Sequence, residues 1–359
     1  MTPMVGATVD SVALRHNLHV VRQRAPRSRV MAVIKANAYG HGLTAVAGAL
    51  AEADAFAVAR VDEGLALRRA GINHPVVLLE GVFDREQLEV ASRERFEMVI
   101  HSPQQIELLH GTDAGERLRV WLKLDSGMNR LGFKGQAFAA ALSALSALPQ
   151  VKQPVGLFTH LASADEPGLD ATREQLACFA AATRSLPGAR SVCNSAGLLN
   201  FTAAQADWVR PGLLLYGVSP LAGAVGAGLG LKPAMTLHAR VIAVKDVAAG
   251  EQVGYGGTWT ADRPTRLAVA SIGYGDGYPR SLGSGAPVLV NGERAALAGR
   301  VSMDMIGIDV SALAVPTRVG DPVVLWGADL PVEEIALHAG TIPYELLCGI
   351  SQRVAVTLR

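Results

Sequence analysis

The stretch Val30-Met-Ala-Val-Ile34 is followed directly by Lys35 and then by Ala-Asn-Ala-Tyr-Gly-His-Gly at positions 36–42. Five consecutive apolar residues between polar neighbours are typical of a strand that is buried on both faces. A helix is expected to follow, with Thr44 as its N-cap. This order of strand, polar residue and helix decides the fold, because it recurs along the first two-thirds of the chain.

Seven more apolar runs follow, with helical stretches between them. The runs cover 56–59, 76–79, 96–100, 118–124, 155–159, 190–193 and 207–209, and further helices are expected near 62, from 84, after 103, and over 136–148, 170–185 and 195–204. Strands that alternate with helices indicate a parallel sheet. Eight such units in roughly 200–250 residues match the size of a TIM-type (β/α)8 barrel. We therefore expect an α/β fold of this kind, with an open doubly wound sheet as the alternative.

The pattern changes after residue 220. Residues 221–230 are rich in glycine and are expected to form a linker, because their Gly-x-Gly-x-Gly lacks the strand–turn–helix context of a nucleotide-binding loop. Residues 235–241 alternate between apolar and polar, and short β-like runs follow at 266–272, 287–290, 296–298 and 323–326. This predicts a barrel over 11–230 and a mainly-β domain over 231–359. Residues 1–10 contain a short strand at 7–9, which is expected to join the β-domain.

The composition excludes several classes of protein. Of the 359 residues, 50% are apolar and 18% are charged, which excludes global disorder. The net charge of +1 gives no reason to expect a nucleic acid or an anionic membrane as partner. No apolar run reaches the ~18 residues of a membrane span, and the first basic residue, Arg15, does not suit a signal peptide. Cys178, Cys193 and Cys348 lie far apart, which predicts a cytoplasmic protein with neither a disulfide framework nor a metal site.

Polar residues follow the apolar runs at the positions where strands of a barrel end. They are Lys35, Arg60, Glu80, His101, Lys123 with Asp125, His160, Asn194 and Arg210. In a TIM barrel the chemistry takes place at this end of the strands. The several cations predict an anionic ligand, such as a phosphate or a carboxylate. A desolvated Lys35 could attack a carbonyl as a neutral amine, and the alternative is a lysine that simply points into solvent.

Residues 32–42, Ala-Val-Ile-Lys-Ala-Asn-Ala-Tyr-Gly-His-Gly, closely resemble the pyridoxal-phosphate lysine motif of the alanine racemases. Further segments resemble the motifs of that family in the family's order: 124–132, 159–162, 193–196, 209–212, 253–257, 273–280 and 299–304. The resemblance extends from Thr8 to Arg359. It implies a pyridoxal 5'-phosphate barrel, a following β-domain and a homodimer.

The resemblance also implies how the cofactor is bound. Lys35 would attach it covalently, and Arg210 would face its pyridine nitrogen; the alternative for Arg210 is an ion pair with Asp207. The other residues expected around the cofactor are Tyr39, His160, Asn194, Ser195, Gly212, Leu213 and Tyr344. A glycine at 212 would let the backbone approach the phosphate closely. For His160 the alternative is a histidine with a purely structural place in the core.

Racemisation needs a base on one face of the substrate and an acid on the other. The resemblance assigns these roles to Lys35 and to Tyr255 of the partner subunit, whose phenol would be acidified by nearby cations; the alternative for this residue is a turn tyrosine. Arg130 would bind the substrate carboxylate, helped by the partner subunit's Met303. Lys123 would be carbamylated and pair with Arg130, or else would be an unmodified lysine beside Asp125.

The expected function is the interconversion of L- and D-alanine, either to supply D-alanine as a peptidoglycan precursor or in catabolism. Three alternatives remain open at this point. A broader-specificity racemase resembles this chain, but its branch has asparagine in place of Lys123 and usually a signal peptide. An amino-acid decarboxylase of similar architecture carries an acid in place of Arg210. A non-catalytic pyridoxal-phosphate-binding protein would be a bare barrel without Tyr255.

Overall fold

The computed structural model describes residues 4–110 and 117–359, and within them eight parallel strands close into a barrel. The strands are β2 (Arg29–Val33), β3 (Ala55–Val58), β4 (Val76–Leu78), β5 (Glu97–Ile100), β6 (Val120–Lys123), β7 (Gly156–Phe158), β8 (Arg190–Asn194) and β9 (Trp208–Arg210). Pairing of β2 with β9 closes the ring. The (β/α)8 barrel is therefore confirmed, and the open sheet is excluded. Almost all residues of these strands are buried, as expected where helices cover the sheet.

The strands alternate with helices that surround the barrel: α1 (Ser11–Arg24) before it, then α2 (Lys35–Tyr39), α3 (Leu43–Ala49), α4 (Val61–Arg69), α5 (Arg85–Arg93), α6 (Pro103–Leu109), α7 (Gly135–Ala147), α8 (Asp170–Thr183) and α9 (Ser195–Asn200). Asp84 caps α5 by accepting the Gln87 N–H. The prediction that Thr44 caps α3 is wrong. The N-cap is Gly42, and the Leu43 N–H is bound instead by the Asn37 side chain.

The β-domain is built on a sheet of eight strands in the described part of the chain, ordered β13-β16-β15-β14-β17-β10-β1-β18. These are β13 (Thr265–Ala270), β16 (Ile306–Asp309), β15 (Glu293–Leu297), β14 (Pro287–Val290), β17 (Pro322–Trp326), β10 (Met235–Val247), β1 (Val5–Val9) and β18 (Ala355–Leu358). The N-terminal strand β1 lies between β10 and β18. The small pair β11 (Gln252–Val253) and β12 (Trp259–Thr260) lies apart from this sheet.

Some elements were not predicted from the sequence. The strands β16 and β18 are short, and β16 carries a glycine in its interior. The helices α10 (Val332–Ala339) and α11 (Pro343–Cys348) lie inside the region expected to be mainly β. The helix expected over 195–204 is divided into α9 and the 3-10 turn η1 (Thr202–Ala204), with Phe201 between them.

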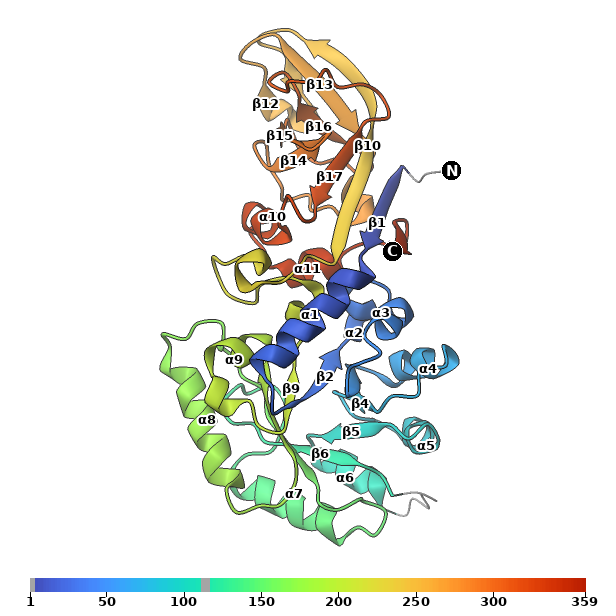
Figure 1. Ribbon diagram of the computed structural model, residues 1–359, viewed down its shortest axis with the longest axis vertical. Coiled ribbons are helices and arrows are strands. Elements are labelled where there is room, and N and C mark those ends of the chain that lie inside the picture. Colours follow the sequence, from blue (N-terminus) through green and yellow to red (C-terminus); the bar gives the residue numbers. More distant parts are fainter. Residues whose placement is uncertain (1–3, 111–116) are drawn as a thin grey trace.

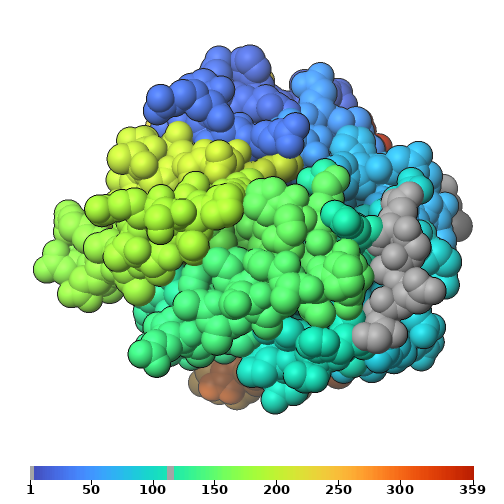
Figure 2. Space-filling view, turned by 90° about the horizontal axis from the view of Figure 1, so that it is seen from below, coloured from blue at the N-terminus to red at the C-terminus, as the bar shows by residue number. Residues whose placement is uncertain are grey.

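The barrel and the β-domain are stacked along the long axis of the molecule, with α10 and α11 next to the barrel (Figure 1). Seen from the barrel end, the segments follow one another around the barrel in chain order, and the β-domain is almost hidden (Figure 2). One continuous apolar core extends from the barrel strands to the β-domain sheet. None of the described helices is long and apolar enough to cross a membrane.

Gly40 is the position where α11 presses most closely on the barrel. It has a φ of +79°, and a Cβ there would lie 2.1 Å from the carbonyl oxygen of Leu347 in α11. Gly71 has almost the same φ, +78°, with nothing within 4 Å of a Cβ. The two glycines therefore separate the cost of a left-handed conformation from the cost of a steric clash.

We expect Gly71→Ala to lower the free energy of unfolding by about 1 kcal/mol, the cost of a left-handed L-residue. Gly40→Ala should lower it by at least about 2 kcal/mol more, because α11 has to move away from the barrel. Urea unfolding followed by circular dichroism measures both. Equal losses would show that α11 does not rest on Gly40.

Candidate active site

Lys35 lies at the mouth of the barrel. It directly follows Ile34, the last residue of the buried run 30–34 that includes most of β2. The four residues that follow it have a left-handed backbone, with φ values of 54° for Ala36, 53° for Asn37, 54° for Ala38 and 52° for Tyr39. Such a conformation costs L-residues on the order of 1–2 kcal/mol each. The turn therefore needs support from its surroundings, and strain of this kind is typical of functional sites.

Three side chains hold the left-handed turn. A carboxylate oxygen of Glu63 accepts the Ala36 N–H at 2.6 Å, and Asn37 Oδ1 accepts the Leu43 N–H at 2.9 Å. His41 Nδ1 lies 2.8 Å from the Tyr39 carbonyl oxygen, and because a carbonyl only accepts, this nitrogen is the donor. Sequence reasoning did not single out Glu63 or His41. No sequence motif could have indicated the role of Glu63. His41 could have been noticed, because it lies inside the 32–42 segment that resembles the lysine motif.

Arg210 ends β9 and is buried beneath the mouth. Its guanidinium donates to Ser191 Oγ at 2.7 Å, to the Thr159 carbonyl at 2.6 Å and to the Val192 carbonyl at 3.1 Å. Burial lowers the pKa of Arg210 to about 9, which still leaves it charged at pH 7. The expected alternative, an ion pair with Asp207, does not form, because the Asp207 carboxylate accepts the Arg190 N–H at 2.7 Å.

Lys123 and His160 lie next to this cation. Burial, and then the charges of Arg130 and Arg210, lower the pKa of Lys123 to about 8. Burial and Arg210 also hold the pKa of His160 well below its usual range, so this imidazole is neutral at pH 7. Its Nδ1 lies 3.4 Å from the guanidinium of Arg210, which places His160 at the site rather than in a separate part of the core.

The turn after β6 carries Arg130. Asp125 accepts the N–H groups of Gly127 and Asn129, at 3.1 and 2.9 Å, and its other oxygen lies 3.6 Å from Lys134 Nζ. The carboxylate is therefore occupied by its own turn and by Lys134. This argues against the alternative in which Asp125 pairs with Lys123, and it leaves the amine of Lys123 facing other cations.

Residues from three loops form a small polar cradle beside the left-handed turn. Ser195 Oγ accepts the Gly212 N–H at 2.9 Å, and Leu213 follows as the start of a buried 3-10 turn. A Cβ on Gly212 would lie 2.5 Å from the hydroxyl oxygen of Tyr39, so only glycine permits this approach. The ring of Tyr344, from α11, lies 5.9 Å from the ring of Tyr39.

Asn194 has a supporting position in this cradle. Its Oδ1 accepts the Gly197 N–H at 2.9 Å and its Nδ2 donates to the Leu161 carbonyl at 3.3 Å. Both polar ends of the side chain are thus used to fix the start of α9, where Ser195 lies.

Tyr216 is a further residue of this region that was not predicted from the sequence. It is fully buried, donates to the Val33 carbonyl at 3.1 Å, and packs its ring 4.8 Å from that of Tyr39.

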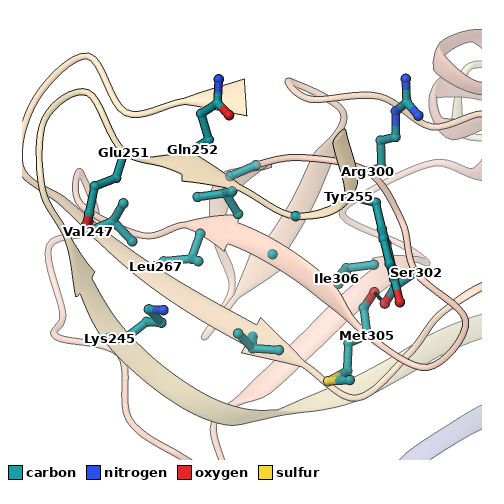
Figure 3. Close-up of a pocket in the computed structure, with 15 residues that line it drawn as sticks. Lys245, Val247, Glu251, Gln252, Tyr255, Leu267, Arg300, Ser302, Met305 and Ile306 are labelled. Atoms are coloured by element: carbon teal, nitrogen blue, oxygen red, sulfur yellow. Dashed lines mark hydrogen bonds between the residues drawn. The ribbon is translucent and has the colours of Figure 1, made fainter. Parts of the chain in front are cut away.

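Tyr255 and Met303 both belong to the β-domain, Tyr255 next to β12 and Met303 in the loop between β15 and β16. Tyr255 begins a 3-10 turn beside β12, at the end of the β-domain far from the barrel (Figure 1). Its side chain is 70% exposed and Met303 is 53% exposed. Tyr255 also lines an open groove of about 730 Å³ in the β-domain, where it lies beside Ser302 and Met305 (Figure 3). This groove is not the cationic site at the barrel mouth.

Comparison with known proteins gives one consistent result. A family model described as the alanine racemase N-terminal domain matches residues 9–220, and one described as the C-terminal domain matches residues 234–358. Alanine racemases from Nitrosococcus oceani and Shewanella woodyi are 52% and 50% identical, covering 98% and 100% of both chains. The crystal structure of biosynthetic alanine racemase from Pseudomonas aeruginosa, 46% identical, superposes with a TM-score of 0.95 over 100% of this chain and 99% of that one. The chain therefore belongs to the alanine racemase family.

Proposed function

We propose that this chain interconverts L- and D-alanine with pyridoxal 5'-phosphate bound to Lys35, and that Lys35 and Tyr255 of the partner subunit act as its two bases. The observation that carries the proposal is the position of Lys35, on a strained and well-supported turn beside a cluster of cations. The cluster suits a ligand with a phosphate and a carboxylate. When bound, the cofactor supplies an electron sink that weakens the Cα–H bond.

The cradle of Tyr39, Ser195 and Gly212 fits a phosphate group. A phosphate needs hydroxyl donors and backbone that can approach it without an intervening Cβ, and Gly212 provides such an approach. We assign Leu213 and Tyr344 to the rim of the same group. We assign His160 to the ring of the cofactor, beside Arg210. Asn194 is assigned to the support of Ser195, because it fixes the start of α9.

Arg210 is assigned to the nitrogen of the cofactor ring. A guanidinium only donates hydrogen bonds, so it opposes protonation of that nitrogen. The ring then withdraws electrons less strongly, which favours rapid return of a proton to Cα over slower side reactions. A decarboxylase of this architecture would carry an acid at this position, whereas this chain has Arg210, whose guanidinium donates to Ser191, Thr159 and Val192.

We assign the substrate carboxylate to Arg130, with the amide of the partner subunit's Met303. Lys123 is assigned a carbamate, which would turn a cation beside Arg130 into an acceptor for it. Its pKa of about 8 favours this, because only a neutral amine combines with carbon dioxide. The presence of a lysine at 123, rather than asparagine, supports alanine over the broader-specificity alternative.

The other base has to come from a second copy, because Tyr255 lies far from the barrel of its own chain. Its exposure of 70% is unusual for an aromatic side chain and suits a residue that enters a neighbouring site. We therefore propose a homodimer. The name of the Pseudomonas aeruginosa relative supports a biosynthetic role. We propose that the chain acts in the cytoplasm and supplies D-alanine for peptidoglycan.

Carbamylation of Lys123 should be visible by 13C NMR in 13C-bicarbonate. We expect a carbamate carbon signal that grows between pH 7 and 9, because rising pH frees more of an amine with a pKa of about 8. Lys123→Arg should remove the signal. Lys134→Arg is the matched control, since Lys134 is an exposed lysine near the same turn. A signal that survives in Lys123→Arg would place the carbamate elsewhere.

The two-base mechanism predicts that Tyr255→Phe affects the two enantiomers unequally. The substitution keeps the ring and removes only the proton-carrying oxygen. Loss of the Cα deuterium from labelled L-alanine in single turnovers should fall by about 10²–10⁴-fold, while loss from D-alanine, which Lys35 serves, should change far less. Lys35→Ala should abolish deuterium loss from both enantiomers.

The control for this experiment is Tyr278→Phe, because Tyr278 is a fully buried tyrosine of the β-domain, whose hydroxyl cannot enter a neighbouring site. It should leave both rates within about two-fold, as expected for a hydroxyl outside the site. Equal losses for L- and D-alanine in Tyr255→Phe would mean that one base serves both faces, and the two-base mechanism would be wrong.

A further inference from the structure

A small cavity lies where the barrel meets the β-domain, directly behind the left-handed turn. It is lined by His41 and Tyr216 from the barrel, by Met235 and Trp326 from the β-domain, and by Leu347 of α11. About 10 Å³ is open to the centre of a water-sized sphere, which is about what one water molecule requires. All five of these side chains are buried or nearly so.

Two of the residues that line this cavity each carry a buried polar atom without a hydrogen-bond partner among the described residues: His41 Nε2 and Trp326 Nε1. Leaving a buried polar atom unpaired costs free energy, so each such atom calls for a partner. His41 is 1% exposed and Trp326 is also 1% exposed, so bulk solvent cannot serve as that partner.

The two atoms are complementary to one another. His41 uses Nδ1–H as a donor to the Tyr39 carbonyl at 2.8 Å, and burial lowers the pKa of His41 to about 4, so the ring is neutral and Nε2 is an acceptor. The indole N–H of Trp326 is only a donor. A molecule placed between them must therefore accept from one side and donate to the other, and water does both.

We propose that one buried water molecule joins the Trp326 N–H to His41 Nε2, and that His41 is thereby a positioning residue for the turn that carries Lys35. The functional part of this inference rests on the role of Lys35 proposed above. His41 connects the two sides of the junction, because its other nitrogen holds the carbonyls of Ala38 and Tyr39 at 3.1 and 2.8 Å.

The neighbours of His41 show how the water-mediated contact between Trp326 and His41 would connect the β-domain to the turn that carries Lys35. The His41 ring lies 4.5 Å from that of Tyr216, which in turn lies 4.8 Å from that of Tyr39. Leu347, another wall of the cavity, places its carbonyl oxygen against Gly40. The β-domain of the same chain thus supports the left-handed segment 36–39 through these contacts.

The water itself can be tested by crystallography at a resolution that shows ordered solvent. The expected result is a single peak within about 3 Å of both His41 Nε2 and Trp326 Nε1. A dry cavity, or a direct contact between the two side chains, would overturn the proposal. This result does not depend on the cofactor, so it is independent of the proposed function.

The positioning role can be tested by amide hydrogen exchange of residues 36–42 in the cofactor-free protein. Trp326→Phe keeps an aromatic ring but removes the N–H together with part of the indole. Exchange should become about five-fold faster or more from the lost buried hydrogen bond, and the double variant described next separates this loss from the loss of packing. The matched control is Tyr278→Phe. Tyr278 is also fully buried and stacked on Trp326, at 6.3 Å, and its hydroxyl likewise lacks a partner among the described residues, but it does not line the cavity.

His41→Phe gives the second arm of the experiment. It should accelerate exchange more than Trp326→Phe, and adding Trp326→Phe to it should have little further effect, because the link is already broken. Effects that simply add would show that the two residues act separately. Unchanged exchange in Trp326→Phe, or an equal change in Tyr278→Phe, would also contradict the positioning role.

Discussion

Four consecutive left-handed residues, Ala36 to Tyr39, are the constraint on which the rest of the site depends. At on the order of 1–2 kcal/mol per residue, this conformation would not persist in isolation. It is maintained by Glu63 from the neighbouring strand–helix unit, by His41, and by α11 resting on Gly40. The barrel alone therefore does not account for the position of Lys35, and the β-domain contributes to it through α11.

The second organising feature is electrostatic. Burial is the main cause that lowers the pKa values of His160 and Lys123. The charges of Lys123, Arg130, Arg210 and Lys35 lower that of His160 further, and the last three of these act on Lys123 in the same way. The described carboxylates near the mouth offset this charge only in part: Glu63 binds backbone N–H groups, and Asp125, which raises the pKa of Lys123, also binds its own turn and Lys134. A pocket in which cations outnumber carboxylates favours ligands that bring negative charge, which suits a phosphate, an amino-acid carboxylate and a carbamate.

The sequence allowed the barrel to be predicted because each strand is a short apolar run that ends in a polar residue. It did not allow the left-handed turn to be predicted, since alanine and asparagine carry no local signal for several such residues in a row and the conformation comes from tertiary contacts. For the same reason Glu63, Tyr216 and the supporting place of Asn194 were missed. Thr44 was a reasonable N-cap by residue type. Instead, the side chain of Asn37, seven residues earlier in the chain, accepts the Leu43 N–H at the start of α3. The roles of the site residues came from family resemblance, and the structure adds the contacts that hold them.

The proposed two-base site requires two chains, because Lys35 lies at the barrel mouth while Tyr255 belongs to the β-domain. The most direct measurement mixes two inactive variants, Lys35→Ala and Tyr255→Phe, under conditions where subunits exchange. A hybrid dimer contains one site with both bases intact and one with neither, so random exchange should restore about a quarter of the activity of the unaltered protein. If mass spectrometry confirms the hybrid and no activity returns, the site is not shared between chains and the account is wrong.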